Sequence, residues 1–285
     1  MISSRPGAAP FTERTPRVVA ARRLTRRAGR THQFLAEGPQ AVREALAAGA
    51  VHELFVTEAT QQRYPELVRA ADHVSLITER AAASLSETVT PQGIIAVCDL
   101  LDQPLDTVVA GTDRRAPRLV AVLVGVADPG NAGTALRIAD AAGADAVLLA
   151  GDTVDPHNGK CVRASAGSLF HVPFARARAI EDALNACRAA GLRLVAADGH
   201  ARDDLDTALD DPGDPLAEPT AWLFGNEAHG LSREVLDAAG TALRVPIHGQ
   251  AESLNLAAAV AVCLYASARA QRHTGTRATS QGSIA

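Results

Sequence analysis

Three separated stretches of the C-terminal half combine glycines with side chains that could bind or activate a ligand. The first reads Asp-Pro-Gly-Asn-Ala-Gly from Asp128 and is followed by Arg137. Asn131 is a suitable helix cap, Gly133 allows a close backbone approach, and Arg137 lies nearly two helical turns beyond Asn131. The same residues also fit a plain capped helix with a surface arginine. They fit a nicotinamide-dinucleotide site less well, because no GxGxxG motif is present.

The second stretch reads Leu-Phe-Gly-Asn-Glu-Ala-His-Gly-Leu-Ser between Leu223 and Ser232. It places Asn226 and Glu227 between two glycines, directly after an apolar run. Polar groups at the end of a buried strand are costly unless something satisfies them, which favours a binding site. The plainer interpretation is a tight turn into a helix capped by Ser232, with His229 as a loop or packing residue.

The third stretch reads Val-Pro-Ile-His-Gly-Gln-Ala-Glu-Ser-Leu-Asn from Val245 to Asn255, and a long Ala-rich segment follows it. Ser253 fits the N-cap of a helix in that segment, which would put Asn255 unusually in the first turn. Two polar groups beside a buried helix indicate that this stretch lines a pocket.

Strands and helices must position these stretches. From Arg118 on, apolar runs alternate with helical patterns, which is typical of an α/β fold with a parallel sheet covered on both faces. Ligands bind at the carboxyl ends of such strands, where the three stretches begin. The expected strands are 119–126, 146–149, 171–174, 192–197, 221–225 and 243–247, and the expected helices are 132–142, 164–170, 180–190, 232–239 and 253–271.

A smaller α/β domain precedes this sheet. Its expected strands are 34–38, 51–57, 74–77 and 93–99, and its expected helices are 18–27, 39–49, 65–71 and one that starts after a Thr78 cap. We therefore divide the chain into a disordered tail, a small domain, a proline-containing linker, a large domain and a second disordered tail, at 1–16, 17–102, 103–117, 118–272 and 273–285.

Composition narrows the class of protein. Hydrophobic residues make up 47% of the chain and aromatic residues only 3%, so a core must be built from Ala, Val, Leu and Ile. The four cysteines lie far apart without a CxxC pair, which indicates reduced thiols in a cytoplasmic protein. No histidine pattern fits a catalytic metal, and no apolar run is long enough to span a membrane.

Charge is unevenly distributed although the net charge is only -4. Seven arginines lie in Arg14–Arg30, and seven acidic residues lie in Asp203–Glu218. The arginine run is either a solvated helix face or arm, or a set of phosphate contacts. The second interpretation predicts nucleic-acid contacts by Arg22, Arg23, Arg26 and Arg27.

Taken together, the three stretches resemble motifs one, two and three of the SpoU (TrmH-type) branch of the SPOUT RNA methyltransferases. The matching residues are Asn131-x-Gly-x-x-x-Arg137, then Gly225-Asn-Glu227-x-x-Gly230-Leu-Ser, then Pro246-Ile-x-Gly-x-x-x-Ser253-Leu-Asn255. A fourth stretch also matches, Lys160-x-x-Arg163-Ala-Ser165-x-Gly167-Ser-Leu-Phe170-x-x-Pro173. The segment from Phe34 to Gly38 and the helix after it are similar to the small substrate-binding domain of many members. Ala228 departs from the family, in which glycine is common at this position.

The resemblance implies a catalytic domain with a C-terminal trefoil knot, which general topology rules would not predict. It implies S-adenosylmethionine as the cofactor, RNA as the partner, and a homodimer with the active site near its interface. The cofactor would be bound by Gly225, Asn226, Gly230, Val245, Ile247 and Leu254. Arg163 would join the N-terminal arginines in contacting RNA.

The resemblance also implies that the residue at Arg137 activates a ribose 2′-hydroxyl. Deprotonating an arginine with a pKa of about 13 at pH 7 costs roughly 8 kcal/mol. We therefore expect Arg137 to stay cationic and to stabilise the developing alkoxide. Asn131 and Glu227 would orient Arg137 or the ribose, and Ser253 and Asn255 would hold the other side of the pocket.

The motifs do not encode the target nucleotide. A separate N-terminal domain favours 23S ribosomal RNA, by family analogy alone. Transfer RNA as the substrate, a non-catalytic RNA-binding relative and a nicotinamide-dependent enzyme are the alternatives.

Overall fold

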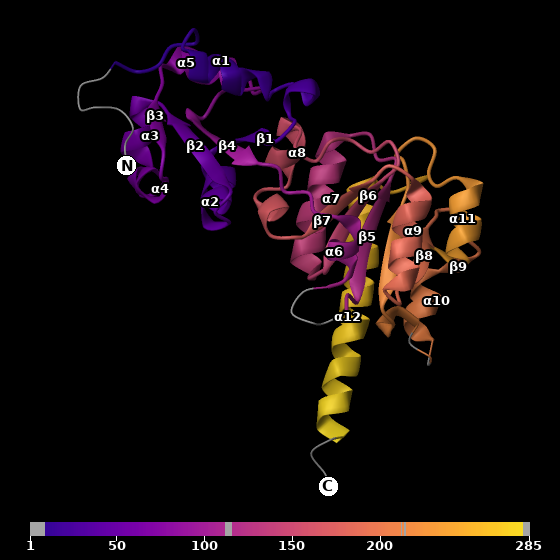
Figure 1. The fold of residues 1–285 in the computed structure, drawn as a ribbon. Helices are drawn as coiled ribbons and strands as arrows, with labels where there is room; N and C mark the ends of the chain where they lie inside the picture. The colour runs from indigo at the N-terminus through magenta and orange to yellow at the C-terminus, as the bar shows by residue number, and fades with distance from the viewer. Residues whose placement is uncertain (1–8, 112–115, 212, 214, 282–285) are drawn as a thin grey trace. The chain divides into compact units, whose positions relative to one another are not determined.

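The computed structural model describes residues 9–111, 116–211, 213 and 215–281, with residues 273–281 described by their backbone. The chain forms two compact units (Figure 1). Unit 1 comprises the described residues up to Leu101 together with Asp155–His171, and unit 2 comprises the rest. Every helix within the described ranges is too short or too polar to cross a lipid bilayer.

Unit 1 is built on a four-stranded sheet in the order β1-β4-β2-β3. Strand β4 (Ile94–Asp99) runs antiparallel to β1 (Gln33–Glu37) and β2 (Val51–Val56), and β2 runs parallel to β3 (Val74–Leu76). The first five residues of β4 are buried, because helices cover both faces of the sheet. All four expected strands of this domain are therefore confirmed, to within a residue or so at each end.

The helices of unit 1 start where the local sequence favours a start. Prolines begin α1, α2 and α4, and the hydroxyls of Thr57 and Thr78 cap α3 and α5. The elements are α1 (Pro16–Arg23), η1 (Arg27–Gly29), α2 (Pro39–Ala47), α3 (Glu58–Arg63), α4 (Pro65–Ala70), α5 (Glu79–Leu85), α8 (Gly159–Ala164) and η2 (Ser168–Phe170).

The expected disordered tail at 1–16 is partly ordered. Phe11 pairs with the end of β3, since its N–H donates to the carbonyl of Leu76 and its carbonyl accepts the N–H of Thr78. Residues 1–8 lie outside the described residues.

The segment Asp155–His171 lies within the expected large domain but folds with unit 1. The helix expected at 164–170 is wrong. The side chain of Asn158 accepts the N–H of Lys160 and starts α8 earlier, and Gly167 at φ +102° separates α8 from the short η2.

Unit 2 contains a parallel sheet of seven strands in the order β7-β6-β5-β10-β8-β11-β9. Every residue of β5, β6 and β10 is buried, as the apolar runs predict for strands covered on both faces. The strands are β5 (Leu119–Val124), β6 (Ala146–Ala150), β7 (Phe174–Ala177), β8 (Arg193–Ala197), β9 (Asp203–Asp204), β10 (Thr220–Phe224) and β11 (Ala242–Arg244). The strand expected at 171–174 is displaced to β7, because residues up to His171 belong to unit 1.

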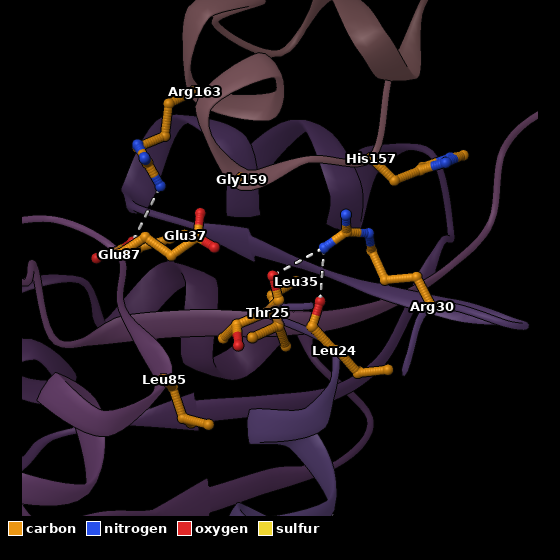
Figure 2. A pocket seen from close by; sticks show the side chains of 10 residues that line it. All are labelled: Leu24, Thr25, Arg30, Leu35, Glu37, Leu85, Glu87, His157, Gly159 and Arg163. Carbon is orange, nitrogen blue, oxygen red and sulfur yellow. Dashed lines mark hydrogen bonds and ion pairs between the residues drawn. The ribbon is translucent and has the colours of Figure 1, made fainter. Parts of the chain in front are cut away.

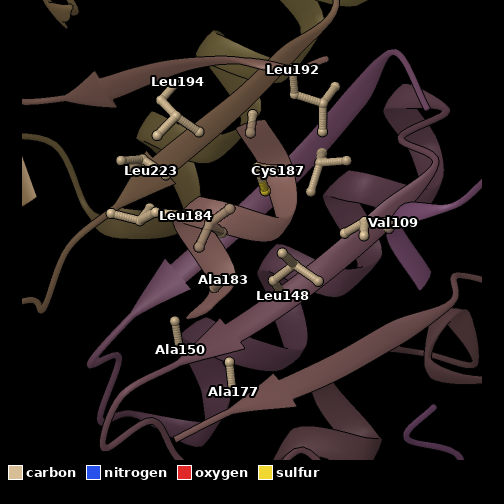
Figure 3. Close-up of a cluster of buried hydrophobic side chains, with 14 of the residues drawn as sticks. Val109, Leu148, Ala150, Ala177, Ala183, Leu184, Cys187, Leu192, Leu194 and Leu223 are labelled. Atoms are coloured by element: carbon tan, nitrogen blue, oxygen red, sulfur yellow. The ribbon is translucent and has the colours of Figure 1, made fainter. Parts of the chain in front are cut away.

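Helices cover the two faces of this sheet. Helices α6, α9 and α11 pack on one face, and Figure 3 shows Leu184 and Cys187 of α9 against Leu148, Leu194 and Leu223 of the strands. Helices α7 and α12 pack together on β5. The elements are α6 (Leu105–Val109), α7 (Pro129–Ala142), α9 (Ile180–Ala189), α10 (Leu205–Asp210), η3 (Pro215–Ala217), α11 (Arg233–Ala239) and α12 (Leu256–Gln281).

Several expected boundaries of unit 2 differ from the structure. The strand expected at 243–247 ends at Arg244, because Pro246 cannot donate to a strand partner, and α7 starts three residues before the expected 132. Helix α12 continues to Gln281 and so includes residues 273–281, which were expected to belong to a disordered tail. No proline interrupts the helix there. Residues 282–285 of that tail lie outside the described residues. Helix α6 lies inside the expected linker at 103–117, after Pro104, which suits a helix start.

Candidate active site

Glu227 joins the loop after β10 to the loop after β5. Its Oε2 accepts the N–H of Ala127 at 3.2 Å, and its Oε1 accepts the N–H of Asp128 at 3.2 Å and the Nδ2 of Asn131 at 3.0 Å. Strands β5 and β10 are parallel neighbours, so their carboxyl ends lie side by side. The polar groups of the first two motifs therefore meet at one edge of the sheet.

The start of α7 explains why the side chain of Asn131 is available for this contact. Asp128, and not Asn131 as the sequence suggested, caps the helix, because its Oδ1 accepts the N–H of Asn131 at 2.8 Å. Pro129 fixes the first helical position and moves the cap one residue before it. Asn131 is thereby placed inside the first turn, with its amide directed to Glu227.

Asn255 links the third motif to the first two. It precedes α12, and its Oδ1 accepts the N–H of Ala257 at 2.9 Å, so it caps the helix in place of Ser253. Its Nδ2 donates to Oδ1 of Asn131 at 3.3 Å. Glu227, Asn131 and Asn255 thus form one hydrogen-bonded chain, which we call the carboxamide chain. Ser253 is exposed and makes no side-chain hydrogen bond within the described residues.

Asn226 connects the loop after β10 to the loop after β5. Its Nδ2 donates to the carbonyl of Gly125 at 2.7 Å, and its Oδ1 accepts the N–H of Ala228 at 2.9 Å. Its backbone exchanges two hydrogen bonds with Gly230, which closes the turn that carries Glu227. The side chain of Asn226, expected to bind the cofactor, is therefore occupied with loop structure.

Gly225 is required by this closure. A Cβ at Gly225 would lie 2.3 Å from the carbonyl carbon of Gly230, and Gly230 itself has φ +65°. Both glycines of the motif therefore serve the tight turn, and any contact with a cofactor would come from their backbone.

Hydrogen bonds decide the ionisation of Glu227. Partial burial by itself would raise its pKa, but the hydrogen bonds from Asn131 and from the backbone N–H groups of Ala127 and Asp128 outweigh that effect and hold the pKa below its usual range. Glu227 is therefore an anion at neutral pH and a poor proton acceptor.

Arg137 projects from the middle of α7 and is exposed. Among the described residues its guanidinium has no hydrogen bond or ion pair. An uncompensated cation in the same helix as Asn131 is available to an anionic ligand.

The segment 245–254 between β11 and α12 suits an adenosine-type cofactor. It has no helix or strand, and within the described residues none of its backbone N–H groups pairs with another backbone group. Ile247 and Leu254 are 38% and 41% exposed, and Val245 is half-buried. Ligand sites commonly combine apolar side chains with a few backbone N–H and C=O groups, and this segment offers both to an adenine ring.

The N-terminal arginines fall into two classes. Arg22, Arg23, Arg26 and Arg27 are exposed, as RNA contact requires. Arg30 is buried, with 4% of its side chain exposed, and its Nε donates to Oδ2 of Asp155 at 2.8 Å. Arg30 is therefore a structural residue of unit 1 and is removed from the basic surface that the sequence indicated.

Arg30 and His157 line a small cavity of about 20 Å³ in unit 1 (Figure 2). Arg30 also donates to the carbonyls of Leu24 and Thr25, and Nε2 of His157 accepts the N–H of Leu101 at 3.1 Å. Arg163, expected to contact RNA, lies at the same cavity with NH1 3.5 Å from Oε2 of Glu37. Because the charges around it are compensated and it has room for about one water, the cavity is not an anion site.

No group of three or more His, Cys, Asp or Glu side chains is placed to hold a metal ion in the described part of the chain. The sequence interpretation gave Asp128 no role, although it caps α7, and it treated His229 as a loop or packing residue. The proline after Asp128 is a signal that could have identified it as the cap. His229 has only its place between Glu227 and Gly230 as a signal.

Comparisons with known proteins identify the family. The SpoU rRNA Methylase family matches residues 118–265, and the MRM3-like substrate binding domain matches residues 15–96. The 23S rRNA (guanosine(2553)-2′-O)-methyltransferase RlmP of Bacillus subtilis (strain 168) is 36% identical over 241 residues, which are 83% of this chain and 88% of that protein.

Two solved structures are similar over nearly the whole chain. A crystal structure of an RNA 2′-O ribose methyltransferase has a TM-score of 0.77 and 32% identity, and covers 93% of this chain and 100% of its own. A crystal structure of an AdoMet-bound rRNA methyltransferase from Sinorhizobium meliloti has a TM-score of 0.76 and 33% identity, and covers 93% of this chain and 98% of its own. With the three motifs joined at one sheet edge and the family matched over more than half of the sequence, the chain belongs to the SpoU rRNA methylase family.

Proposed function

We propose that this protein transfers the methyl group of S-adenosylmethionine to a ribose 2′-hydroxyl of 23S ribosomal RNA. The observation that carries the proposal is the carboxamide chain, in which Asn131 is hydrogen-bonded to both Glu227 and Asn255. Helix α7, which contains Asn131, also carries Arg137. Relatives that are similar along most of the chain bear the names of 23S rRNA 2′-O-methyltransferases.

S-adenosylmethionine supplies an electrophilic methyl group on a sulfonium. The residues fit this cofactor, because the irregular segment 245–254 offers unpaired backbone groups together with Ile247 and Leu254. We assign the cofactor to that segment and to the backbone of Gly225 and Gly230. Asn226 acts by holding the loop in shape.

Arg137 stays cationic in this proposal. It stabilises the oxygen of the ribose as negative charge develops, and it contacts the adjacent phosphate. Asn131 and Glu227 fix the start of α7, on which Arg137 stands, and Asn255 fixes the facing side. Ser253, exposed beside Asn255, is available to the ribose.

Residues 17–102 are assigned to RNA binding and residues 118–272 to catalysis, with Arg22, Arg23, Arg26 and Arg27 as phosphate contacts. Arg163 is less suited to a phosphate contact, because Glu37 compensates its charge. We place the reaction in the cytoplasm, which agrees with four buried cysteines that form no disulfide.

We further propose that the protein is a homodimer with a trefoil knot at its C-terminal end. Val262 and Tyr265 of α12 are 41% and 49% exposed and lie about one helical turn apart, so α12 presents an apolar surface. A second copy of the chain would cover it.

The test is a methylation assay with the full chain and tritiated S-adenosylmethionine. We expect label in unmodified 23S rRNA, with a single methylated ribose on mapping, and none in a DNA copy, which lacks the 2′-hydroxyl. S-adenosylmethionine should raise the melting temperature and NAD should not. Label in transfer RNA but not in 23S rRNA would contradict the proposed substrate.

A further inference from the structure

The turn that carries Glu227 also carries His229, which the roles above leave unused. His229 is exposed, and its Nδ1 lies 3.3 Å from Oδ1 of Asn226. Backbone hydrogen bonds between Asn226 and Gly230 close the turn, so the backbone that carries the imidazole ring is held in place.

The partners of Asn226 determine which nitrogen of His229 carries a proton. The Nδ2 of Asn226 faces the carbonyl of Gly125 and its Oδ1 faces the N–H of Ala228, so the orientation of the amide is fixed by two backbone groups. Oδ1 can only accept, so Nδ1 of His229 must donate to it. In the neutral ring, Nε2 is then left with a free lone pair.

The groups to which the proposed function assigns a role are poor proton acceptors, and Nε2 of His248 in the segment 245–254 faces Asp206 at 3.9 Å. Glu227 receives three hydrogen bonds, which hold its pKa below the usual range, and Asp128 uses Oδ1 for the N–H of Asn131. Arg137 is a cation, and the side chains of Asn131, Asn255 and Ser253 are not bases at neutral pH. An acceptor oriented by a third group, as Asn226 orients His229, is the usual arrangement around a general base.

We propose that Nε2 of His229 accepts the proton of the ribose 2′-hydroxyl in the methylation reaction. The O–H bond breaks, the proton forms a new N–H bond at Nε2, and the electron pair stays on the oxygen, which bonds to the methyl carbon while the C–S pair stays on sulfur. The imidazolium then returns the proton to water. This inference rests on the proposed function and divides the chemistry between His229 as acceptor and Arg137 as charge stabiliser.

The tautomer of His229 tests the geometry without any turnover. In 15N-histidine protein at about pH 8.5, above the usual histidine titration, long-range 1H–15N spectra should show the His229 proton on Nδ1. Asn226→Ala should return the ring to the Nε2–H form that is common in water. An Nε2–H signal in the wild-type chain would overturn the proposal, because Nε2 would have no lone pair.

Rescue by imidazole tests the chemistry. His229→Ala should lower kcat about 10²–10⁴-fold, with unchanged affinity for S-adenosylmethionine and for 23S rRNA, and added imidazole should restore part of the rate. The matched control is His200→Ala, which removes an exposed histidine from the loop after β8 and should show neither loss nor rescue.

Two results would overturn the proposal, namely a His229→Ala rate within about twofold of wild type, or a loss that appears in KM for RNA and does not respond to imidazole. If the wild-type chain fails to methylate 23S rRNA, the proposed function fails first, and the tautomer experiment still tests His229.

Discussion

Two carboxylates, one in each unit, organise polar networks of opposite kind. In unit 1, Asp155 is 7% exposed and lies against the buried Arg30 and His157. In unit 2, Glu227 is exposed and receives its hydrogen bonds from the loop after β5. Hydrogen bonds lower the pKa of both carboxyls against the opposing effect of burial. The difference predicts that substitutions around the buried Asp155 affect folding, whereas substitutions around the exposed Glu227 affect the proposed reaction.

Removing the cation of the buried network should have the largest effect. Arg30→Met leaves Asp155 buried without its cation, and should lower the free energy of unfolding by about 3–5 kcal/mol in urea titrations. The control is Arg17→Met, which breaks an exposed pair with Glu53 and should cost about 1 kcal/mol or less. Equal effects of the two substitutions would remove the distinction between the buried and exposed networks.

Removing the exposed cation of α7 should affect turnover and not folding. Arg137→Ala should lower kcat about 10²–10³-fold, because a charge stabiliser is lost. Its melting temperature and its affinity for S-adenosylmethionine should match the wild type. Arg233→Ala, which removes an exposed arginine of α11, should leave the rate unchanged. Normal methylation by Arg137→Ala would show that the assigned role is wrong.

Within the carboxamide chain, two substitutions should not be additive. Asn255 donates to Asn131, so Asn131→Ala already removes the contact that Asn255→Ala would break. The double variant should lose less activity than the sum of the single losses, with a coupling energy of about 0.5–3 kcal/mol from kcat/KM. Strict additivity would mean that the 3.3 Å contact does not form in solution.

Acid should destabilise the protein through the buried network. Burial alone would raise the pKa of Asp155, but hydrogen bonds from His157 and Arg30, together with the charge of Arg30, hold it well below the usual range. A lowered folded-state pKa contributes stability above the unfolded-state value of about 3.9, and this contribution is lost as pH falls below that value toward the folded-state pKa. Urea titrations from pH 6 downward should show this decline in the wild type. In Asp155→Asn, the free energy of unfolding should fall less over this pH range, because asparagine does not ionise. An equally steep fall in the variant would contradict the role given to Asp155.

The smallest effect is expected on the basic surface. Phe11 and Arg30 belong to the fold of unit 1, so deleting the whole N-terminal segment would disturb the domain itself. Replacing Arg22, Arg23, Arg26 and Arg27 by Gln should weaken binding of 23S rRNA severalfold. In a plot of log binding constant against log salt concentration, the slope should become shallower by about 0.7–0.9 for each lost phosphate contact. An unchanged slope would remove these four residues from the RNA interface.

Local signals were enough for most of the fold. Apolar runs at β5, β6 and β10 predicted strands buried on both faces, and proline or threonine at helix starts predicted α2, α4 and α5. The segment after β6 was misplaced because its residues fold against unit 1, and no local pattern encodes which unit a segment joins. The start of α8 within it follows a local signal, the Asn158 cap.

The sequence by itself determined the residue types of the active site and the chemistry that they permit, because motif spacing after buried strands is a local property. Only the tertiary structure decided which side chains are free to act. It gave the cap of α7 to Asp128 and so directed Asn131 to Glu227, and it gave the cap of α12 to Asn255. It also buried Arg30 and left Arg22 exposed, although both lie in one arginine run. Burial and hydrogen-bond partners depend on residues distant in the chain, so spacing alone cannot assign them.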